Sequence, residues 1–242
     1  MAFKLAVLLA VCTVSTVYSA HVGYSYAQRQ SDTAQAQYNL GNLHLRRSEI
    51  QQAIEYFRLS ADQGFRSARY NLGVIYSRRD GLEKDPGEDI KWYALAAAQG
   101  HPTAQFNLGV FYRDGLGTAA DGRKAVEWFT RSAENGNVFA QLNLARIYTL
   151  GKVAPKNLTR AYMWLEIARN PFSRARNTHS RALNDRIANV RNSAVTAIKL
   201  LEEQISSADT LHAKERARYW LGKFDTVGNN HTSTRRFQAS AS

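Results

Sequence analysis

An internal repeat dominates this sequence, and self-similarity at a fixed period restricts a chain to a stacked array of like units. One phrase of six residues occurs four times: a small residue, a variable residue, a ring or leucine, Asn-Leu and a second small residue. A second phrase pairs a bulky ring with another apolar residue and then places small residues one turn later. The first phrase begins at Ala36, Ala68, Ala104 and Ala140, and the second begins at Tyr56, Trp92, Trp128 and Trp164. The second phrase steps by 36 residues each time, whereas the first steps by 32, 36 and 36, which predicts a loop four residues shorter in the first repeat.

Each repeat is predicted to hold two helices. Its apolar and small residues lie three and four positions apart, as Ala104, Leu108 and Phe111 do, which is the spacing of one helical stripe. A helix pair of this kind cannot bury its apolar face alone, so neighbouring pairs must stack into one continuous core. Glycines are expected to end the second helices, and small residues on the first helices are expected to let neighbours approach closely. The ending glycines are Gly64, Gly100 and Gly136, and the small contact residues are Gly41, Gly73, Gly109 and Ala145.

These two phrases resemble the Sel1-like repeat family, a relative of the tetratricopeptide repeat. The resemblance covers residues 34–170 and implies an all-α fold, an α/α right-handed superhelical solenoid of Sel1-like helix pairs. Two positions depart from the family pattern: His44 replaces an aromatic residue, and the last repeat ends in Asn170-Pro171-Phe172 where a glycine turn is usual. Less regular packing is therefore expected at both ends of the array.

The repeat register is lost after Pro171. Apolar residues from Leu183 to Ile205 recur at steps of three and four, which predicts a long amphipathic helix that covers the end of the solenoid. A final helix is predicted from Ser207 to Leu221, closed by Gly222. The expected organisation is a signal peptide at 1–20, an N-terminal linker at 21–33, four Sel1-like repeats at 34–170, C-terminal capping helices at 171–224 and a disordered tail at 225–242.

The first twenty residues have the layout of a secretory signal peptide. Lys4 precedes an apolar run from Leu5 to Val11, and small and hydroxyl residues follow as far as Ala20. The run is short for a membrane anchor, which needs about 20 apolar residues. Cleavage after Ala20 or after Ala27 leaves a mature chain without cysteine, since Cys12 is the only one; lipidation of Cys12 is the minor alternative. The expected location is therefore periplasmic or secreted, with no transmembrane segment after cleavage.

The chain carries a formal net charge of +12, which draws anionic partners at long range without identifying them. For a basic protein, nucleic acid is the usual first hypothesis. Export argues against it, so no nucleic acid is expected as partner. Acidic proteins, anionic polysaccharide and lipid head groups fit an exported protein better.

No residue pattern indicates catalysis, a metal site or a cofactor. The six histidines stand far apart in the sequence, and no phosphate-binding loop or nucleophile motif occurs. The chain is therefore predicted not to be an enzyme and to need no cofactor. The ring ladder of Tyr56, Trp92, Trp128 and Trp164 is interpreted as core, with a sugar-stacking stripe as the alternative.

Asparagine recurs in the middle of all four first helices, although it is a mediocre helix former. Two interpretations stay open: a structural hydrogen bond to the adjacent repeat, or an amide row that holds a peptide backbone, because an amide donates and accepts at once. Arginines on the same helices could clamp carboxylates, or could be a solvated face. The candidate peptide-binding residues are Asn39, Asn71, Asn107 and Asn143 with Arg46, Arg78, Arg113 and Arg146.

The sequence thus predicts an exported adaptor that binds a protein or peptide partner, possibly an acidic one, in a concave groove. The resemblance implies that such exported proteins often regulate membrane sensors, support assembly of the cell envelope or take part in host contact. An envelope-associated hydrolase of the Sel1 type and a binder of anionic polysaccharide are the alternatives, and the missing cysteine pairs disfavour the hydrolase.

Overall fold

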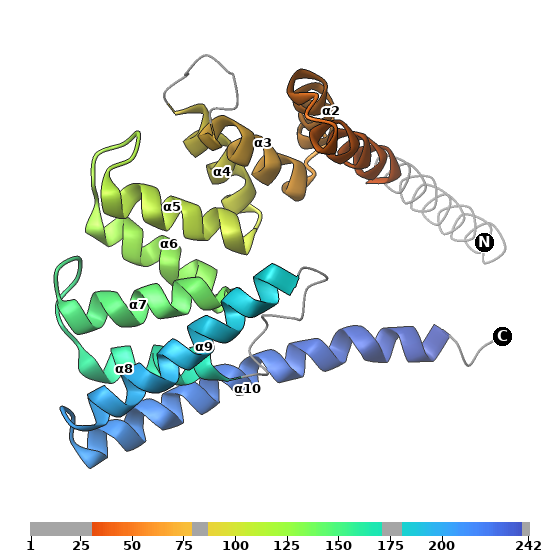
Figure 1. The fold of residues 1–242 in the computed structure, drawn as a ribbon. Helices are drawn as coiled ribbons and strands as arrows, with labels where there is room; N and C mark the ends of the chain where they lie inside the picture. Colours follow the sequence, from red (N-terminus) through yellow and green to blue (C-terminus); the bar gives the residue numbers. More distant parts are fainter. Residues whose placement is uncertain (1–30, 79–86, 171–180, 239–242) are drawn as a thin grey trace, which may run out of the picture. The chain divides into compact units, whose positions relative to one another are not determined.

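The computed structural model describes residues 31–78, 87–170 and 181–238, with side chains as far as residue 222. All regular structure in those ranges is helical (Figure 1). The predicted signal peptide at 1–20 lies outside the described residues, as do most of the linker and the loops at 79–86 and 171–180. No described helix combines the length and the apolar character needed to cross a membrane.

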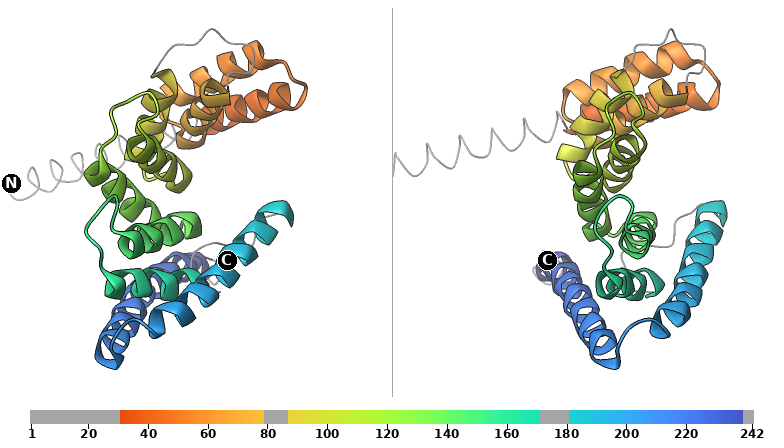
Figure 2. Two further views of the ribbon diagram at one scale, coloured as in Figure 1. Left: turned by 60° about the vertical axis from the view of Figure 1, so that its left-hand side comes forward. Right: turned by 90° about the vertical axis from the view of Figure 1, so that its left-hand side faces the viewer.

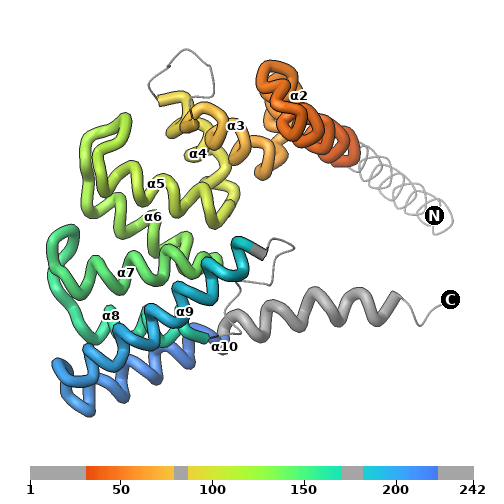
Figure 3. The backbone as a smooth tube through the Cα atoms, in the orientation of Figure 1, coloured from red at the N-terminus to blue at the C-terminus, as the bar shows by residue number. Residues whose placement is uncertain are grey.

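The chain divides into two compact units, one ending at Ala96 and the other beginning at Ala97. The helices follow one another in short antiparallel pairs within each unit (Figures 1 and 3). The first unit contains a helix at 31–46 followed by α2 (Ile50–Asp62), α3 (Arg66–Arg78) and most of α4 (Glu88–Ala98). The second contains α5 (Pro102–Asp114), α6 (Gly122–Glu134), α7 (Val138–Leu150), α8 (Leu158–Arg169), α9 (Arg181–Glu202) and α10 (Ser207–Gln238). The predicted all-α solenoid of helix pairs is confirmed.

Glycines set the turns between repeats as expected. Gly64, Gly100 and Gly136 have φ of 84°, 75° and 84°, the left-handed region that residues with a Cβ resist. The fourth repeat ends differently, since Asn170 caps α8 in an extended conformation with φ of −69° and ψ of 122°. The chain therefore leaves the repeat register at that residue.

The core is built from pairs of a glycine on a first helix and a ring on the second helix of the same repeat. A Cβ placed on Gly109 would lie 2.6 Å from Cδ1 of Phe129, and the corresponding distances in the first two repeats are 2.6 Å and 2.7 Å. The rings are fully or almost fully buried. The pairs are Gly41 with Phe57, Gly73 with Tyr93 and Gly109 with Phe129. In the fourth repeat Ala145 and Leu165 occupy the same positions, so a smaller side chain replaces the ring where the glycine is lost.

This arrangement corrects the interpretation of the ring ladder. Tyr56, Trp92 and Trp128 are half-buried, and only Trp164 among the four leaders is buried, at 6% exposed. The adjacent residue fills the core instead, because neighbouring positions on a helix point about 100° apart and cannot both face inward.

A side chain near the start of each later first helix caps the second helix of the preceding repeat. Gln105 donates from Nε2 to the Ala97 carbonyl at 3.0 Å, and Gln141 donates to the Ala133 carbonyl at 3.2 Å. In the second repeat Arg69 plays this part, donating from Nε to the carbonyl of Ala61 at 3.1 Å. These carbonyls belong to last turns, which lack partners within their own helix. Each repeat thus adds a side-chain bond to the helix end before it, at a carbonyl that also accepts from the N–H of the glycine after the helix.

A second amide contact closes the repeat on itself. Asn135 donates to Oε1 of Gln105 at 2.9 Å, and in the first repeat Gln63 donates to Oε1 of Gln37. The partners are 30 residues apart in the third repeat and 26 apart in the first. The same contact therefore survives a four-residue deletion, which lies in the loop between helices at 47–49, as predicted.

In the fourth repeat this second contact is not found among the described residues. Gln141 is fully buried, and its Oε1 has no hydrogen-bond partner in the part of the chain that the structure describes. The position 30 residues later is Pro171, which lies outside the described residues and whose side chain contains no N–H. The register is lost at the residue whose chemistry prevents the closing bond.

Helices α9 and α10 cover the last repeat, as predicted. Both pack on α8, which lies between them (Figure 2). The buried face of α9 includes Ile187, Ala194 and Ile198, members of the predicted stripe. The hydroxyl of Tyr162 on α8 donates to Oε1 of Glu202 at 2.7 Å, and burial, followed by this bond, raises the pKa of that hydroxyl.

The final helix is longer than predicted. α10 begins at Ser207 as expected but continues through Gln238, past the predicted end at Gly222 and over most of the segment predicted as a disordered tail. No proline interrupts this stretch, and a glycine inside a helix costs about 1 kcal/mol without ending it.

Candidate binding surface

All eight predicted contact residues lie on first helices, and all are at least partly accessible. Four are exposed and four are half-buried. Since the two units are described separately, each set is placed within its own unit. The exposed residues are Asn39, Arg46, Arg78 and Arg146, and the half-buried residues are Asn71, Asn107, Asn143 and Arg113.

In the first unit, Asn71 bridges two repeats. Its Nδ2 donates to Oδ1 of Asn42 on the preceding first helix at 3.2 Å. Asn39 accepts a bond from Gln35 on its own helix at 3.0 Å and is exposed. Burial raises the pKa of the Tyr70 hydroxyl, and the charge of Arg78 opposes that rise. Arg78 therefore acts electrostatically on Tyr70, a ring of the same helix α3. The amide of Asn71 in the second repeat therefore makes a structural bond, whereas the amide of Asn39 in the first repeat faces solvent.

In the second unit, Asn143 holds an arginine of the preceding repeat. Nη1 of Arg113 donates to Oδ1 of Asn143 at 2.9 Å, while Nδ2 of Asn143 donates to the Phe139 carbonyl at 2.9 Å. The side chain of Asn107 makes no hydrogen bond among the described residues. The structural interpretation of the asparagines therefore applies to Asn71 and Asn143, and Asn107 keeps its amide available.

Three of the predicted residues line one cavity. Arg113, Asn143 and Arg146 surround a space of about 110 Å³ together with Lys152. Ile147, Leu150 and Val153 supply the apolar part of the wall, and Leu150 is 52% exposed. The cavity thus combines three cations with an apolar edge.

Asp114 moderates the charge of this cavity. It accepts two bonds from Arg113, at 2.7 Å and 2.6 Å. These bonds hold the pKa of the Asp114 carboxyl below its usual range, and the charge of Arg146 adds to the effect; the same bonds raise the pKa of Arg113. Three cations against one carboxylate leave a local charge of +2, which suits an anionic group of a ligand.

Sequence reasoning missed Lys152. This residue follows Gly151, whose φ of 70° ends α7 in a left-handed turn and brings the loop back toward the helix. The equivalent glycine Gly115 ends α5 in the same way, with φ of 69°. This recurring glycine turn is the sequence feature from which a loop side chain beside the arginines of the first helices could have been predicted.

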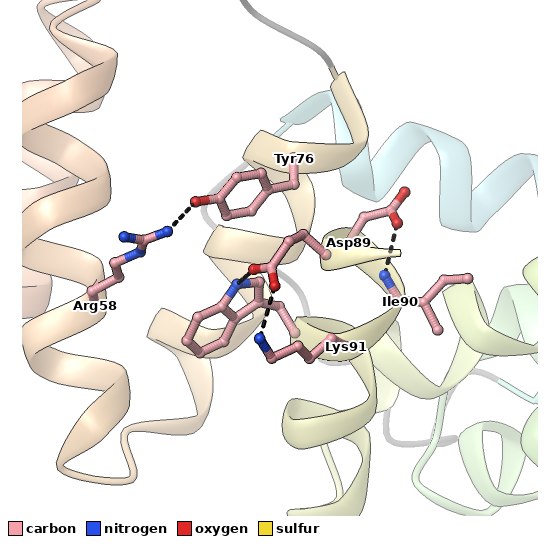
Figure 4. A network of polar contacts seen from close by, with 7 residues as sticks. Arg58, Tyr76, Asp89, Ile90 and Lys91 are labelled. Atoms are coloured by element: carbon pink, nitrogen blue, oxygen red, sulfur yellow. Dashed lines mark hydrogen bonds and ion pairs between the residues drawn. The ribbon is translucent and has the colours of Figure 1, made fainter. Parts of the chain in front are cut away.

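A separate polar network lies in the first unit (Figure 4). Arg58 on α2 donates to the Tyr76 hydroxyl on α3 at 2.7 Å. On α4, Glu88 accepts from Lys91 at 2.7 Å and from Nε1 of Trp92 at 2.9 Å. The bond from Lys91 is the largest influence that lowers the pKa of Glu88. The network orders the start of α4, and it gives the half-buried Trp92 a polar partner in place of full burial.

The described residues contain no group of three histidine, cysteine, aspartate or glutamate side chains that could hold a metal ion. The candidate surface combines cations, amides and apolar side chains on stacked helices.

Comparison with known proteins agrees with this architecture. The model of the Sel1 repeat matches four consecutive stretches, 34–65, 66–101, 102–137 and 138–170, which together make up more than half of the chain. These matches begin and end where the predicted repeat region does. None of the curated proteins matches the sequence significantly.

Two solved structures are similar. One is the crystal structure of a protective antigen present in uropathogenic Escherichia coli strains, which displays an SLR fold; it matches with a TM-score of 0.61 at 28% identity, over 81% of this chain and 39% of that chain. This chain therefore spans about two fifths of that protein's length. The other, a Sel1 repeat protein from Oxalobacter formigenes, matches with a TM-score of 0.53 at 24% identity, over 77% of this chain and 87% of that chain. The second likeness concerns the fold alone.

Proposed function

This chain belongs to the Sel1 repeat family, whose repeats typically mediate protein–protein interaction and are generally non-catalytic, and on that premise we propose that it is an exported scaffold that binds an acidic segment of a protein partner on its first helices. The observation that carries the proposal is the cavity that gathers Arg113, Asn143, Arg146 and Lys152. It joins residues of two repeats and one loop, so it exists only in the stacked array.

The residues have different tasks. Asn143 positions the guanidinium of Arg113 through the 2.9 Å bond, and Asp114 already occupies two of that guanidinium's donors. Arg146 is exposed and Lys152 lies on the loop, so these two cations meet an incoming carboxylate first. Hydrogen bonds to charged groups contribute about 1.5–3 kcal/mol each when they form. The apolar edge at Leu150 then receives a neighbouring side chain of the partner.

The test uses a defined acidic probe. A fluorescent polyglutamate peptide is titrated with the full chain, and binding is followed by fluorescence anisotropy. The variant Arg146→Ala with Lys152→Ala is expected to bind at least about tenfold more weakly, which corresponds to about 1.4 kcal/mol. The matched control is Lys124→Ala with Arg131→Ala, which removes the same charge from the second helix α6 and is expected to change the affinity by less than about twofold.

The control separates a site from general attraction. If both double variants weaken binding equally, the peptide responds to net charge alone and the proposed surface is wrong. Circular dichroism of both variants verifies that each remains folded. Raising the salt concentration should weaken binding by the parent chain, because exposed charges are screened beyond about 10 Å at 0.1 M.

Export is the second part of the proposal, and it is supported by the charge and apolar run of residues 1–20. Mass measurement of the N-terminus of the protein from its native cells tests it. A mature chain that begins within residues 19–28 supports export. A chain that retains Met1 and is recovered from the cytoplasm contradicts it and restores nucleic acid as a candidate partner.

A further inference from the structure

A second surface lies on the second helices of the last repeats, away from the residues of the cavity described above. A groove of about 410 Å³ runs between α6, α8 and α10, and one side chain of α7 reaches it. The cavity at Arg113 and this groove share no lining residue. The two surfaces can therefore be altered independently.

The floor of the groove is apolar and well buried. Tyr148, Met163 and Trp164 are 8%, 9% and 6% exposed, and the rings of Trp164 and Trp220 meet edge to face with centroids 6.1 Å apart and planes at 71°. The lip is different, because Tyr219 on the capping helix α10 is 69% exposed. A large ring that packing leaves in water beside a buried apolar floor provides surface that an occupant would cover.

The residue types are those of a protein interface. Tyrosine, tryptophan, methionine and arginine are enriched at interface cores, and tryptophan, tyrosine and arginine dominate binding hot spots. Seven of the nine lining residues belong to these four types, and none is lysine: Tyr148, Arg160, Met163, Trp164, Arg216, Tyr219 and Trp220, with Thr130 and Glu134 completing the wall.

The charges at the rim select the occupant. Arg160 stacks over the ring of Tyr148 at 5.5 Å, and Arg216 is exposed and takes part in no ion pair among the described residues. Glu134 comes from α6, so the negative end of the groove lies on a different helix from the arginines. A carboxylate on the occupant would meet Arg216, and a backbone N–H or a basic side chain would meet Glu134.

Ring geometry separates a protein segment from a sugar. Stacking of a sugar needs an open flat ring face. On the floor, Trp164 is almost fully buried and meets Trp220 at a steep angle, so the largely exposed ring is Tyr219 at the lip. Such a floor encloses a compact side chain instead. We propose that the groove between α6, α8 and α10 is a second docking site, which takes an aliphatic or aromatic side chain of an extended protein segment with an acidic residue beside it.

The experiment selects ligands for the groove itself. A displayed library of random short peptides is panned on the full chain and counter-selected on the Tyr219→Ala variant, so that only peptides that depend on the lip survive. The surviving peptides are expected to pair an apolar residue with an acidic one. Arg216→Glu, which takes no part in the selection, should weaken their binding at least about tenfold, as the loss of a hot-spot residue does. Tyr219 is exposed, so circular dichroism of Tyr219→Ala is expected to show an intact fold.

Two controls fix the location. Leu211→Ala removes another exposed apolar side chain of α10, 55% exposed and outside the groove, and should leave binding unchanged. The variant Arg146→Ala with Lys152→Ala should also bind the selected peptides normally, which separates this site from the first-helix surface. The chain has four tryptophans, so fluorine NMR of 5-fluorotryptophan-labelled protein adds an internal reference: peptide should shift Trp164 and Trp220 and leave Trp92 and Trp128 unchanged.

Three results would overturn the inference. The first is a selection that yields no peptide dependent on Tyr219. The second is a peptide whose binding survives Arg216→Glu or shifts the resonances of Trp92 and Trp128 instead. The third is an oligosaccharide, found on a glycan array, whose binding is lost in the Tyr219→Ala variant, because the groove would then be a sugar site.

Discussion

The ring of Phe129 lies where a side chain on Gly109 would have to be. A Cβ on that glycine would approach three ring atoms of Phe129 at 2.6, 2.7 and 2.9 Å, closer than carbon atoms pack. The space left by the missing side chain of Gly109 is therefore filled by the ring of Phe129 on the partner helix. The pair brings the two helices of a repeat together at a single defined point.

Gly109→Ala is expected to lower the free energy of unfolding by about 1–3 kcal/mol, because the added methyl group overpacks a filled core. Gly222→Ala is the matched control: nothing lies within 4 Å of its Cβ position, and alanine is a better helix former by about 1 kcal/mol. Urea denaturation followed by circular dichroism measures both. If Gly109→Ala were neutral or stabilising, the ring would be free to move aside.

Phe129→Ala is expected to destabilise by about 3–5 kcal/mol, since it empties a fully buried site. Trp128→Ala should cost less than half as much, because Trp128 is half-buried and its ring also faces the guanidinium of Arg131 at 4.6 Å. The same denaturation experiment ranks the two. If Trp128→Ala lowered the free energy of unfolding more than Phe129→Ala, Trp128 would be the core ring instead of Phe129.

Gln105→Leu should destabilise more than Gln141→Leu. The first change removes the bond from Gln105 to the Ala97 carbonyl, which keeps its bond from the Gly100 N–H, and it also leaves the Asn135 side-chain amide without its partner. Each such hydrogen bond contributes about 0.5–1.5 kcal/mol. The second change removes a single donor bond, along with an oxygen that has no partner among the described residues. Unfolding midpoints of the two variants make the comparison, and equal losses would show that the Asn135 contact contributes little.

Stability should fall in acid partly through Glu88. Bonds from Lys91 and Trp92 lower the pKa of its carboxyl below the ordinary value of 4.5. Its contribution is therefore fully present above pH 4.5 and is lost as the pH falls through the lower, folded-state pKa. Unfolding measured against pH for the parent and for Glu88→Gln should show two curves that differ near neutrality and converge in acid. Parallel curves would exclude Glu88 as a contributor.

The fold was predictable because its signals are local and repeated. A stripe of Ala104, Leu108 and Phe111 predicts a helix wherever it occurs, and a glycine with positive φ is a property of one turn. The choice between Trp128 and Phe129 for the core was not predictable, since both are large rings on adjacent helix positions. Which one faces inward depends on how the helices cross, and that depends on Gly109.

The candidate site was predictable only in part. The sequence places Arg113, Asn143 and Arg146 on first helices, but it does not show that Asn143 turns its oxygen to Arg113 or that Asp114 competes for the same guanidinium. Lys152 comes from a loop whose path is set by Gly151. Tyr219 and Trp220 line one groove with Met163 and Trp164, and they come from α10, which was predicted only as part of the cap. The groove therefore had no signal in the repeat pattern.

The amide contact between Gln105 and Asn135 survives in the first repeat although the chain there is four residues shorter. The connection between paired helices can therefore change length while the stacked core keeps its register. An engineered epitope or enzyme domain placed at Thr118, in the longer third connection, would project from the solenoid without disturbing Gln105. The same insertion placed between Asn135 and Ala140, where one repeat joins the next, would separate Gln141 from the Ala133 carbonyl that it caps.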